Sequence, residues 1–201
     1  MTRRSNTRED QLRRTVAHEA ARIMAEQGID DFLLAKRKAA ERLHISNISA
    51  LPKNTEIEAA LIEYQRLFQS QHHERQLYEL RHVALHLMQL LHDFRPRLVG
   101  SVLSGSATAH TEINLHVFVD RAEQIVMQLE EHGIQPHHAE KKVRYEPDRV
   151  ISCPSFKFIA GQQAVEIVVF PLDGIRQSPS SPVDGRPMPR ADIEAVADLL
   201  K

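Results

Sequence analysis

The hydrophobic periodicity of the chain changes at Pro96, and this change constrains the fold of the 201 residues more than any other feature. Before Pro96, apolar residues recur at steps of three and four, which is typical of helices with one buried face. After Pro96, apolar residues alternate or form short runs, which is typical of strands. The sequence therefore predicts an α+β protein, in which a helical N-terminal region, residues 1–95, precedes a small mixed-sheet domain, residues 96–201.

Turn and cap residues divide each region further. In the first, Asn6 or Thr7 is expected to cap a helix that Gly28 ends, and Thr55 with Glu58 fits a capping box. The predicted helices of this region cover residues 7–27, 30–43, 55–68 and 74–93. The second region is expected to hold strands at 97–103, 113–119, 141–145, 150–159 and 165–170, helices at 121–131 and 191–200, and a loop at 171–189.

Composition excludes several classes of protein. Charged residues make up 26% of the chain and the formal net charge is -1, which excludes a strongly cationic nucleic-acid binder. The single cysteine, Cys153, excludes an internal disulfide and fits a reducing compartment. No apolar run is long enough for a membrane span, and the polar start lacks the core of a signal peptide. We expect a cytoplasmic protein that does not enter a membrane.

One segment carries a pattern that points to chemistry. The strand that begins at Arg97 breaks at Gly100-Ser101, a turn whose amide groups suit a phosphate. About ten residues later, Glu112 and Asn114 begin the next strand, and residues two apart on a strand share a face. Two oxygen ligands beside a phosphate turn are typical of a magnesium–nucleotide site.

This segment resembles the signature of the DNA polymerase β-like nucleotidyltransferases, and its layout is closest to the minimal bacterial members. In those proteins a second glycine, an alanine and a hydroxyl residue precede an Asp-x-Asp pair, and here Gly105, Ala107 and Thr111 hold those places. The family also carries a third acid on a later strand, and Glu166 within Val165–Phe170 matches that position. The resemblance covers roughly residues 97–170.

The resemblance implies roles for these residues. Glu112, Asn114 and Glu166 would be the catalytic and metal-binding residues, with Mg2+ or Mn2+ as cofactor and Glu166 as the base. The nucleotide would be held by Gly100, Ser101 and Gly105. Apart from the resemblance, His110 and His116 are candidates for nucleotide binding because they flank the acidic pair, and Lys157 is a candidate because it stands on the strand before Glu166. The reaction would transfer a nucleoside monophosphate from an NTP, releasing pyrophosphate, to an acceptor such as RNA or a protein.

The segment departs from the family pattern at both motif acids. Glu112 replaces the first aspartate with a longer side chain, and Asn114 replaces the second with a neutral amide. The arginine that often follows Gly-Ser is missing, since Val102 and Ser104 stand there. These departures leave a second interpretation open, a catalytically inactive module that binds a nucleotide, a protein or a nucleic acid. A third is that the segment is a coincidence in an unrelated α+β fold, which predicts that Glu112 and Glu166 lie far apart.

Two other patterns have an ordinary structural interpretation that we favour. His82 and His86 lie one helical turn apart, a spacing compatible with zinc, but no clear further ligands follow. The loop pairs His72-His73 and His137-His138 are interpreted as exposed. The basic face of the second helix suits a phosphate backbone, yet acidic residues interrupt it, which favours a solvated face. Its residues are Lys36, Arg37, Lys38 and Arg42, and Arg3, Arg4, Arg13 and Arg14 precede it in the chain.

Overall fold

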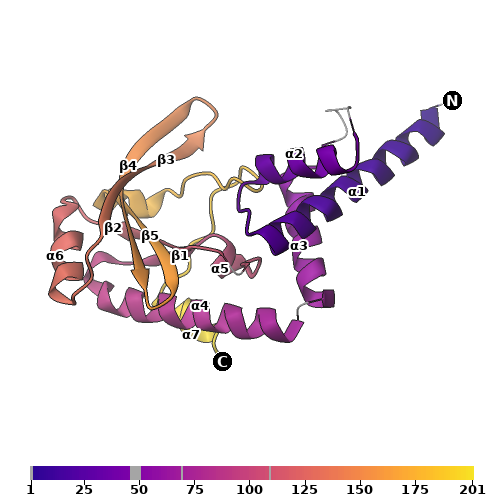
Figure 1. The fold of residues 1–201 in the computed structure, drawn as a ribbon. Coiled ribbons are helices and arrows are strands. Elements are labelled where there is room, and N and C mark those ends of the chain that lie inside the picture. The colour runs from indigo at the N-terminus through magenta and orange to yellow at the C-terminus, as the bar shows by residue number, and fades with distance from the viewer. Residues whose placement is uncertain (1, 46–50, 69, 109) are drawn as a thin grey trace. The chain divides into compact units, whose positions relative to one another are not determined.

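The computed structural model describes residues 2–45, 51–68, 70–108 and 110–201. Helices precede a five-stranded mixed sheet (Figure 1), so the predicted α+β class with a helical N-terminal half is confirmed. The chain forms two compact units. The helical unit comprises the residues up to 75 together with 106–111 and 182–184. The sheet unit comprises 76–105, 112–181 and 185–201.

This division differs from the predicted boundary at 95/96. Most of α4 (Ser70–Leu90) belongs to the sheet unit, because the unit boundary falls after Arg75. Two short segments of the second half, 106–111 and 182–184, belong instead to the helical unit. Hydrophobic periodicity reports what kind of element a segment forms, and it does not report which neighbour that element packs against.

The helical unit is built from α1 (Thr2–Gln27), α2 (Phe32–Arg42) and α3 (Asn54–Phe68). Helix α1 begins at Thr2, so the cap predicted at Asn6 or Thr7 is wrong, because the helix continues through both residues. Its end at Gly28, which has a φ of 63°, agrees with the prediction. The fully buried residues include several alanines, which let the helices approach closely. The buried core consists of Val16, Ala17, Ala20, Ala21, Ile23, Met24, Ala35, Ala39, Ile57, Ala60 and Leu61.

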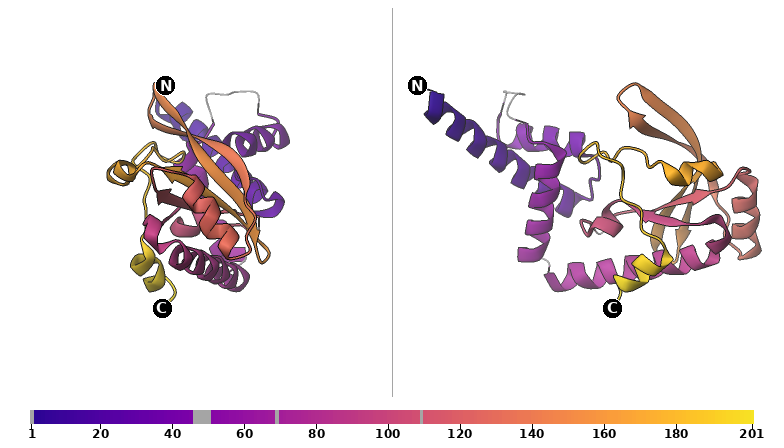
Figure 2. Two further views of the ribbon diagram at one scale, coloured as in Figure 1. Left: turned by 90° about the vertical axis from the view of Figure 1, so that its left-hand side faces the viewer. Right: turned by 180° about the vertical axis from the view of Figure 1, so that it is seen from behind.

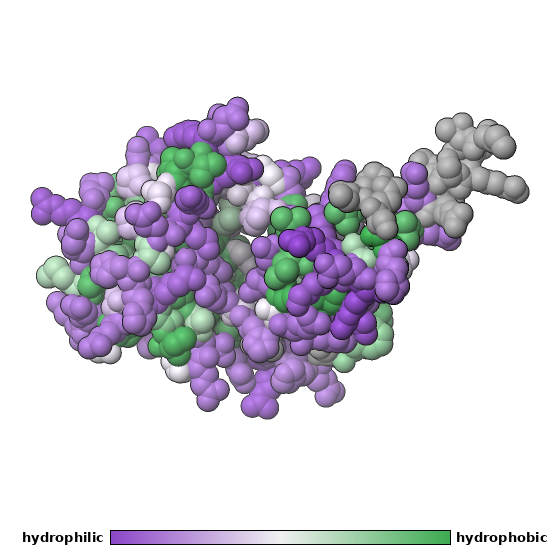
Figure 3. Space-filling view, turned by 45° about the horizontal axis from the view of Figure 1, so that its top comes forward, coloured by the Kyte–Doolittle hydropathy of each residue, from purple (hydrophilic) through white to green (hydrophobic). Residues whose placement is uncertain are grey.

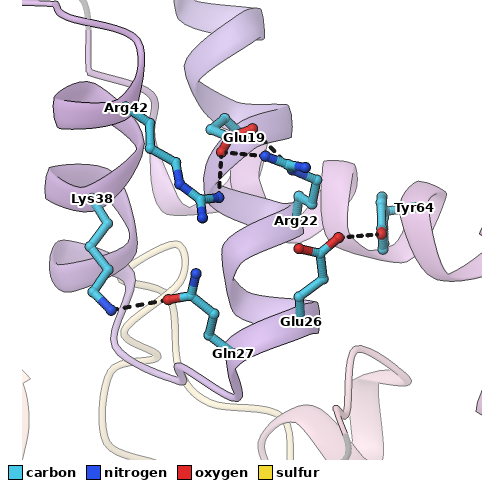
Figure 4. A network of polar contacts seen from close by, with 7 residues as sticks. All are labelled: Glu19, Arg22, Glu26, Gln27, Lys38, Arg42 and Tyr64. Atoms are coloured by element: carbon cyan, nitrogen blue, oxygen red, sulfur yellow. Dashed lines mark hydrogen bonds and ion pairs between the residues drawn. The ribbon is translucent and has the colours of Figure 1, made fainter.

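Polar contacts join the three helices at their surface (Figure 4). Arg42 of α2 donates to Glu19 of α1, and Lys38 donates to Gln27. Tyr64 of α3 donates its hydroxyl to Glu26 of α1. The side chains of Lys38 and Arg42 are therefore engaged within the unit, and Lys36 is partly buried, which lowers its pKa. These contacts favour a structural role for the basic face of α2.

The sheet unit orders its strands β1-β2-β5-β4-β3, with β2 and β5 parallel and the other pairs antiparallel. Figure 2 gives two further views of these elements. The strands are β1 (Arg97–Val99), β2 (Ile113–Phe118), β3 (His137–Glu146), β4 (Arg149–Ala160) and β5 (Gln163–Phe170). The other elements are η2 (His92–Phe94), α5 (Ser101–Ser104), α6 (Glu123–Glu131), η3 (Leu172–Arg176) and α7 (Ile193–Asp198).

Several predicted elements differ in extent. The strand predicted at 97–103 ends at Val99, because Gly100 turns the chain into α5. The strand predicted at 141–145 spans His137–Glu146, since β3 forms a long hairpin with β4. His137 and His138 consequently lie on a strand and not in a loop. The predicted loop at 171–189 contains the short helix η3.

The alternation of side chains gives the sheet two distinct faces. On one face, the odd-numbered residues of β2 and β5 from Ile113 to Val117 and from Val165 to Val169 are all apolar and buried. The opposite face, which we call the site face, carries Asn114, His116 and Phe118 of β2. The register aligns these with Glu166, Val168 and Phe170 of β5. Part of the site face is apolar, with Phe118, Val143, Cys153, Val168 and Phe170 in one cluster and Ile175 of η3 against it.

The face of the molecule drawn in Figure 3 mixes hydrophobic and hydrophilic residues. Hydrophobic side chains on the face drawn in Figure 3 form separate patches among hydrophilic ones, as on most proteins. Among the helices of the described residues, none is both long and apolar enough to cross a membrane.

Candidate functional site

The glycine turn lies next to the start of β2. Gly100 has a φ of 74° and a ψ of -155°, a conformation that glycine adopts far more readily than other residues. Val99 pairs with Asn114 across the two strands, and a Cβ added to Gly100 would lie 3.8 Å from Nδ2 of Asn114. Gly100 therefore borders the motif residue Asn114, and Ser101 follows it as the first residue of α5. Gly105 has a different place, since it ends α5 with a φ of 88°.

The three predicted site carboxylate and amide groups share the site face. Asn114 and Glu166 are direct partners across β2 and β5. Glu112 precedes Asn114 by two residues, and the amide of Asn114 donates to the carbonyl of Glu112 over 3.0 Å. The two carboxylates contact a common lysine, so the expectation that they lie far apart, which would follow from a coincidental motif, is not met.

Two lysines accompany the two carboxylates. Nζ of Lys157 lies 3.2 Å from both carboxylate oxygens of Glu112 and 3.8 Å from Oε1 of Glu166. Nζ of Lys141 lies 2.6 Å from Oε2 of Glu166. The Glu166 side chain is only 2% exposed, whereas the Lys141, Lys157 and Glu112 side chains are 46%, 42% and 37% exposed. We call these four residues the ionic cluster.

In this arrangement two lysines occupy the space beside the carboxylates that a divalent metal would need. Glu112 and Glu166 supply two negative charges, and Lys141 with Lys157 supply two positive charges, so the ionic cluster is neutral. A divalent ion bound between the carboxylates would repel both ammonium groups, so it would have to displace them. Within the described ranges, histidine, cysteine and acidic side chains form no group of three that suits a metal. The magnesium or manganese cofactor stays a prediction from the resemblance.

His116 lies on the site face but has a structural environment. Its ring is buried 4.6 Å from the ring of Phe170, and Nε of Arg190 donates to its Nδ1 over 3.1 Å. The imidazole is therefore neutral with its proton on Nε2. Burial, with the positive charges of Arg190 and Lys141, lowers the pKa of His116 to about 3. A ring that stays neutral and already accepts from an arginine is poorly suited to bind a phosphate.

His110 belongs to a different compact unit from the rest of the predicted site residues. His110 belongs to the segment 106–111 of the helical unit, where its ring lies over Gly28. A Cβ at Gly28 would lie 2.1 Å from Cδ2 of His110, which is far too close, so the contact requires glycine there.

Two residues of the site face were missed by sequence reasoning. Lys141 stands in a strand where polar residues of both charges alternate, which resembles any exposed edge strand. Arg190 lies in the C-terminal segment, and it reaches the sheet because Leu98 bridges to Ala191. Its guanidinium lies 4.9 Å and 5.1 Å from the ring centroids of Phe118 and Phe170. The sequence offers one weak signal for Lys141, which begins a predicted strand, and none for Arg190, which stands between the predicted loop and the predicted last helix.

Comparison of the chain with protein-family models, with curated proteins and with solved structures found no match.

Proposed function

We propose that the sheet unit is a nucleotidyltransferase-like module that binds a nucleoside triphosphate through its phosphates, without a divalent metal and without catalysing transfer. The observation that carries this proposal is the position of Lys157, whose Nζ contacts the carboxylates of both Glu112 and Glu166. In the enzymes that the segment resembles, acids at these positions hold metal ions. Here an ammonium group of this chain would supply the positive charge instead.

The exposure of the four side chains favours exchange of one counter-ion for a phosphate. Glu166 is buried and stays between its two lysines, whereas the Glu112 side chain is more than one third exposed. Glu112 can rotate into solvent at small cost, because exposed ion pairs contribute little, about 0–1 kcal/mol. Lys157 would then donate to a phosphate oxygen, and the remaining cluster of one carboxylate and two ammonium groups would be positive.

The neighbouring turn supports the same assignment. Gly100 borders Asn114, which is the partner of Glu166 across β2 and β5, so the turn is near the ionic cluster. Backbone amides near lysine side chains are typical of phosphate sites. We therefore assign the phosphates to Lys157, Lys141 and the Gly100–Ser101 turn, and we give the buried His116 no part in binding.

A second candidate is the metal-dependent enzyme, which one observation favours. Glu112, Asn114 and Glu166 share a face beside the glycine turn, as the resemblance to nucleotidyltransferases implies. In this case the acids would bind Mg2+ or Mn2+, and a nucleoside monophosphate would pass to an acceptor. The two candidates make opposite predictions for the removal of the Glu112 charge: the metal-free module should bind ATP more tightly, and the enzyme should lose its activity.

The deciding variant is Glu112→Gln, measured by titration with ATP in EDTA and again in magnesium. For the metal-free module, the variant binds ATP several-fold more tightly than the wild type in EDTA, because a competing carboxylate is gone. Lys157→Met lowers the affinity about tenfold or more. Lys142→Met is the matched control, since Lys142 is next to Lys141 but points to the other face of β3, and it leaves the affinity unchanged.

The outcome that would establish the enzyme instead is magnesium-dependent pyrophosphate release that Glu112→Gln abolishes. Asn114→Asp is a second test of the enzyme. A third carboxylate makes the ionic cluster negative, and we expect it to raise the affinity for metal. Failure of the wild type to bind ATP in EDTA would refute the metal-free module.

A further inference from the structure

The sheet unit contains a cavity at the end of β2 that is opposite to the ionic cluster. Glu112 directly precedes this strand, whereas Asp120 and Arg121, which line the cavity, follow it. The cavity has a volume of about 460 Å³, which is within the range of pockets that bind small molecules. All of its lining residues belong to the sheet unit. The cavity is therefore a feature of one compact body and is separate from the nucleotide site that we propose.

The cavity lies where two neighbouring parallel strands end. β2 and β5 are the parallel pair of the sheet, and Phe118 and Phe170 are their last residues. Phe118 lines the cavity from β2, and Leu172 lines it from the chain that follows β5. The carboxyl ends of parallel strands are where sheets of this kind commonly bind ligands, because the connections that leave the strands form a crevice there.

Charges of both signs face the cavity without pairing with one another. Arg121 lines it together with Asp93 and Asp120. Among the residues that the structure describes, the guanidinium of Arg121 has no ion pair and no hydrogen bond. Oδ1 of Asp120 accepts from the amide of Leu172 over 3.5 Å, and Oδ1 of Asp93 lies 3.0 Å from Nε2 of His92. The guanidinium and the second oxygen of each carboxylate are thus available to a ligand.

Apolar side chains form another part of the lining. Phe94 of η2, Phe118 of β2 and Leu172 of η3 all contribute, and Leu172 is 47% exposed. A ligand with only negative charge would meet two carboxylates, and a ligand with only positive charge would meet Arg121. A molecule that carries an ammonium, a carboxylate and an apolar group complements all three parts of the lining.

We propose that this cavity binds an α-amino acid with an apolar side chain. Its ammonium group pairs with Asp120 and Asp93, its carboxylate accepts from the guanidinium of Arg121, and its side chain contacts Phe94 and Leu172. A planar guanidinium suits this role, because it can donate to both oxygens of a carboxylate. This binding site does not rest on the proposed function, and its test uses no nucleotide.

The first experiment is a titration of the full chain with L-phenylalanine, read from the backbone amide signals of Asp120, Arg121 and Gln124. Gln124 also lines the cavity. Three analogues each lack one of the recognised groups: glycine lacks the apolar side chain, phenylalanine amide lacks the carboxylate, and N-acetylphenylalanine lacks the ammonium. We expect L-phenylalanine to bind saturably and each analogue to bind about fivefold more weakly or worse.

The second experiment removes single charges from the lining. Asp120→Asn keeps an oxygen acceptor for the Leu172 amide, and Arg121→Gln removes a side chain that has no partner in the fold, so both variants should fold normally. Each should weaken L-phenylalanine about fivefold or more. Glu123→Gln and Arg176→Gln are the matched controls, because both side chains are exposed and neither lines the cavity. These two variants should leave the affinity unchanged.

Three outcomes would overturn the proposal. The first is that L-phenylalanine gives no saturable shift of the three amide signals up to its solubility limit. The second is that phenylalanine amide or N-acetylphenylalanine binds as tightly as L-phenylalanine, which would show that one of the two charges is not recognised. The third is that the control variants weaken binding as much as the cavity variants, which would show a general effect of charge and no site at this cavity.

Discussion

Glu19 in the helical unit and Glu166 in the sheet unit are both held between two cations, but the cations differ. Glu19 accepts from Nε and Nη2 of Arg22 over 3.1 Å and 2.9 Å, and from Nη1 of Arg42 over 3.0 Å (Figure 4). These bonds lower the pKa of Glu19, although its partial burial opposes them. Glu166 contacts two lysines instead, and one of them also contacts Glu112.

This difference separates a structural ion pair from a site that can rearrange. Arg22 binds the Glu19 carboxylate through two donors of its planar guanidinium within α1, and Arg42 joins α2 to the same carboxylate. An ammonium is a compact charge on a flexible stem, and it can exchange one oxygen ligand for another. The ionic cluster therefore suits an exchangeable anion. Glu19 with Arg22 and Arg42, which we call the arginine cluster, suits helix packing.

Removal of both lysines tests this comparison with the largest expected effect. In Lys141→Met/Lys157→Met, the buried carboxylate of Glu166 loses both partners, which we expect to cost about 3 kcal/mol at pH 7.5. Amide exchange of β5 measures the opening free energy of the sheet unit. Equal stability of the variant and Lys142→Met at pH 7.5 would contradict the importance of the pairing.

The titration of His116, which lies on the same face of the sheet, should change the stability of the sheet unit with pH. Its pKa is about 3 in the fold against an ordinary value of 6.5, so the unfolded chain binds the extra proton between these values. The stability is thus full above pH 6.5 and falls as the pH falls towards 3, by about 2 kcal/mol between pH 7.5 and pH 5. His116→Gln keeps an acceptor for Arg190 but does not titrate, so this part of the pH dependence should vanish. The same β5 exchange experiment at both pH values measures it, and a slope equal to the wild type would show that His116 is not buried as a neutral ring.

The local parts of the site could be predicted from the sequence. Alternation along Ile113–Phe118 correctly placed Glu112, Asn114 and His116 on one face, because side-chain direction in a strand depends only on residue parity. The convergence of Glu166 depended on a family resemblance, since parity alone does not tell which strands are neighbours. It is the parallel register of β2 with β5 that sets Glu166 beside Asn114.

The non-local contacts could not be predicted. Lys141 reaches Glu166 from β3, the far edge of the sheet, and Arg190 reaches His116 from the C-terminal segment. Both contacts depend on which distant segments become neighbours in the fold, and no local sequence pattern indicates this. His110 illustrates the converse, that residues close in sequence can belong to different units. It stands two residues from Glu112, but it packs over Gly28 because the segment 106–111 belongs to the helical unit.

The smallest expected effect concerns the arginine cluster. Arg42→Met should cost at most about 1 kcal/mol, because the Arg42 side chain is 48% exposed and Glu19 keeps its two bonds to Arg22. Arg37→Met is the control, as Arg37 is an exposed cation on the same helix. Amide exchange of α2 measures the local stability, and ATP titration in EDTA measures binding. We expect Arg42→Met to weaken α2 slightly and to leave ATP binding unchanged, because this cluster holds helices and not a ligand. A loss of ATP affinity as large as that of Lys157→Met would assign the anion to the basic face of α2, and the distinction between the two clusters would fail.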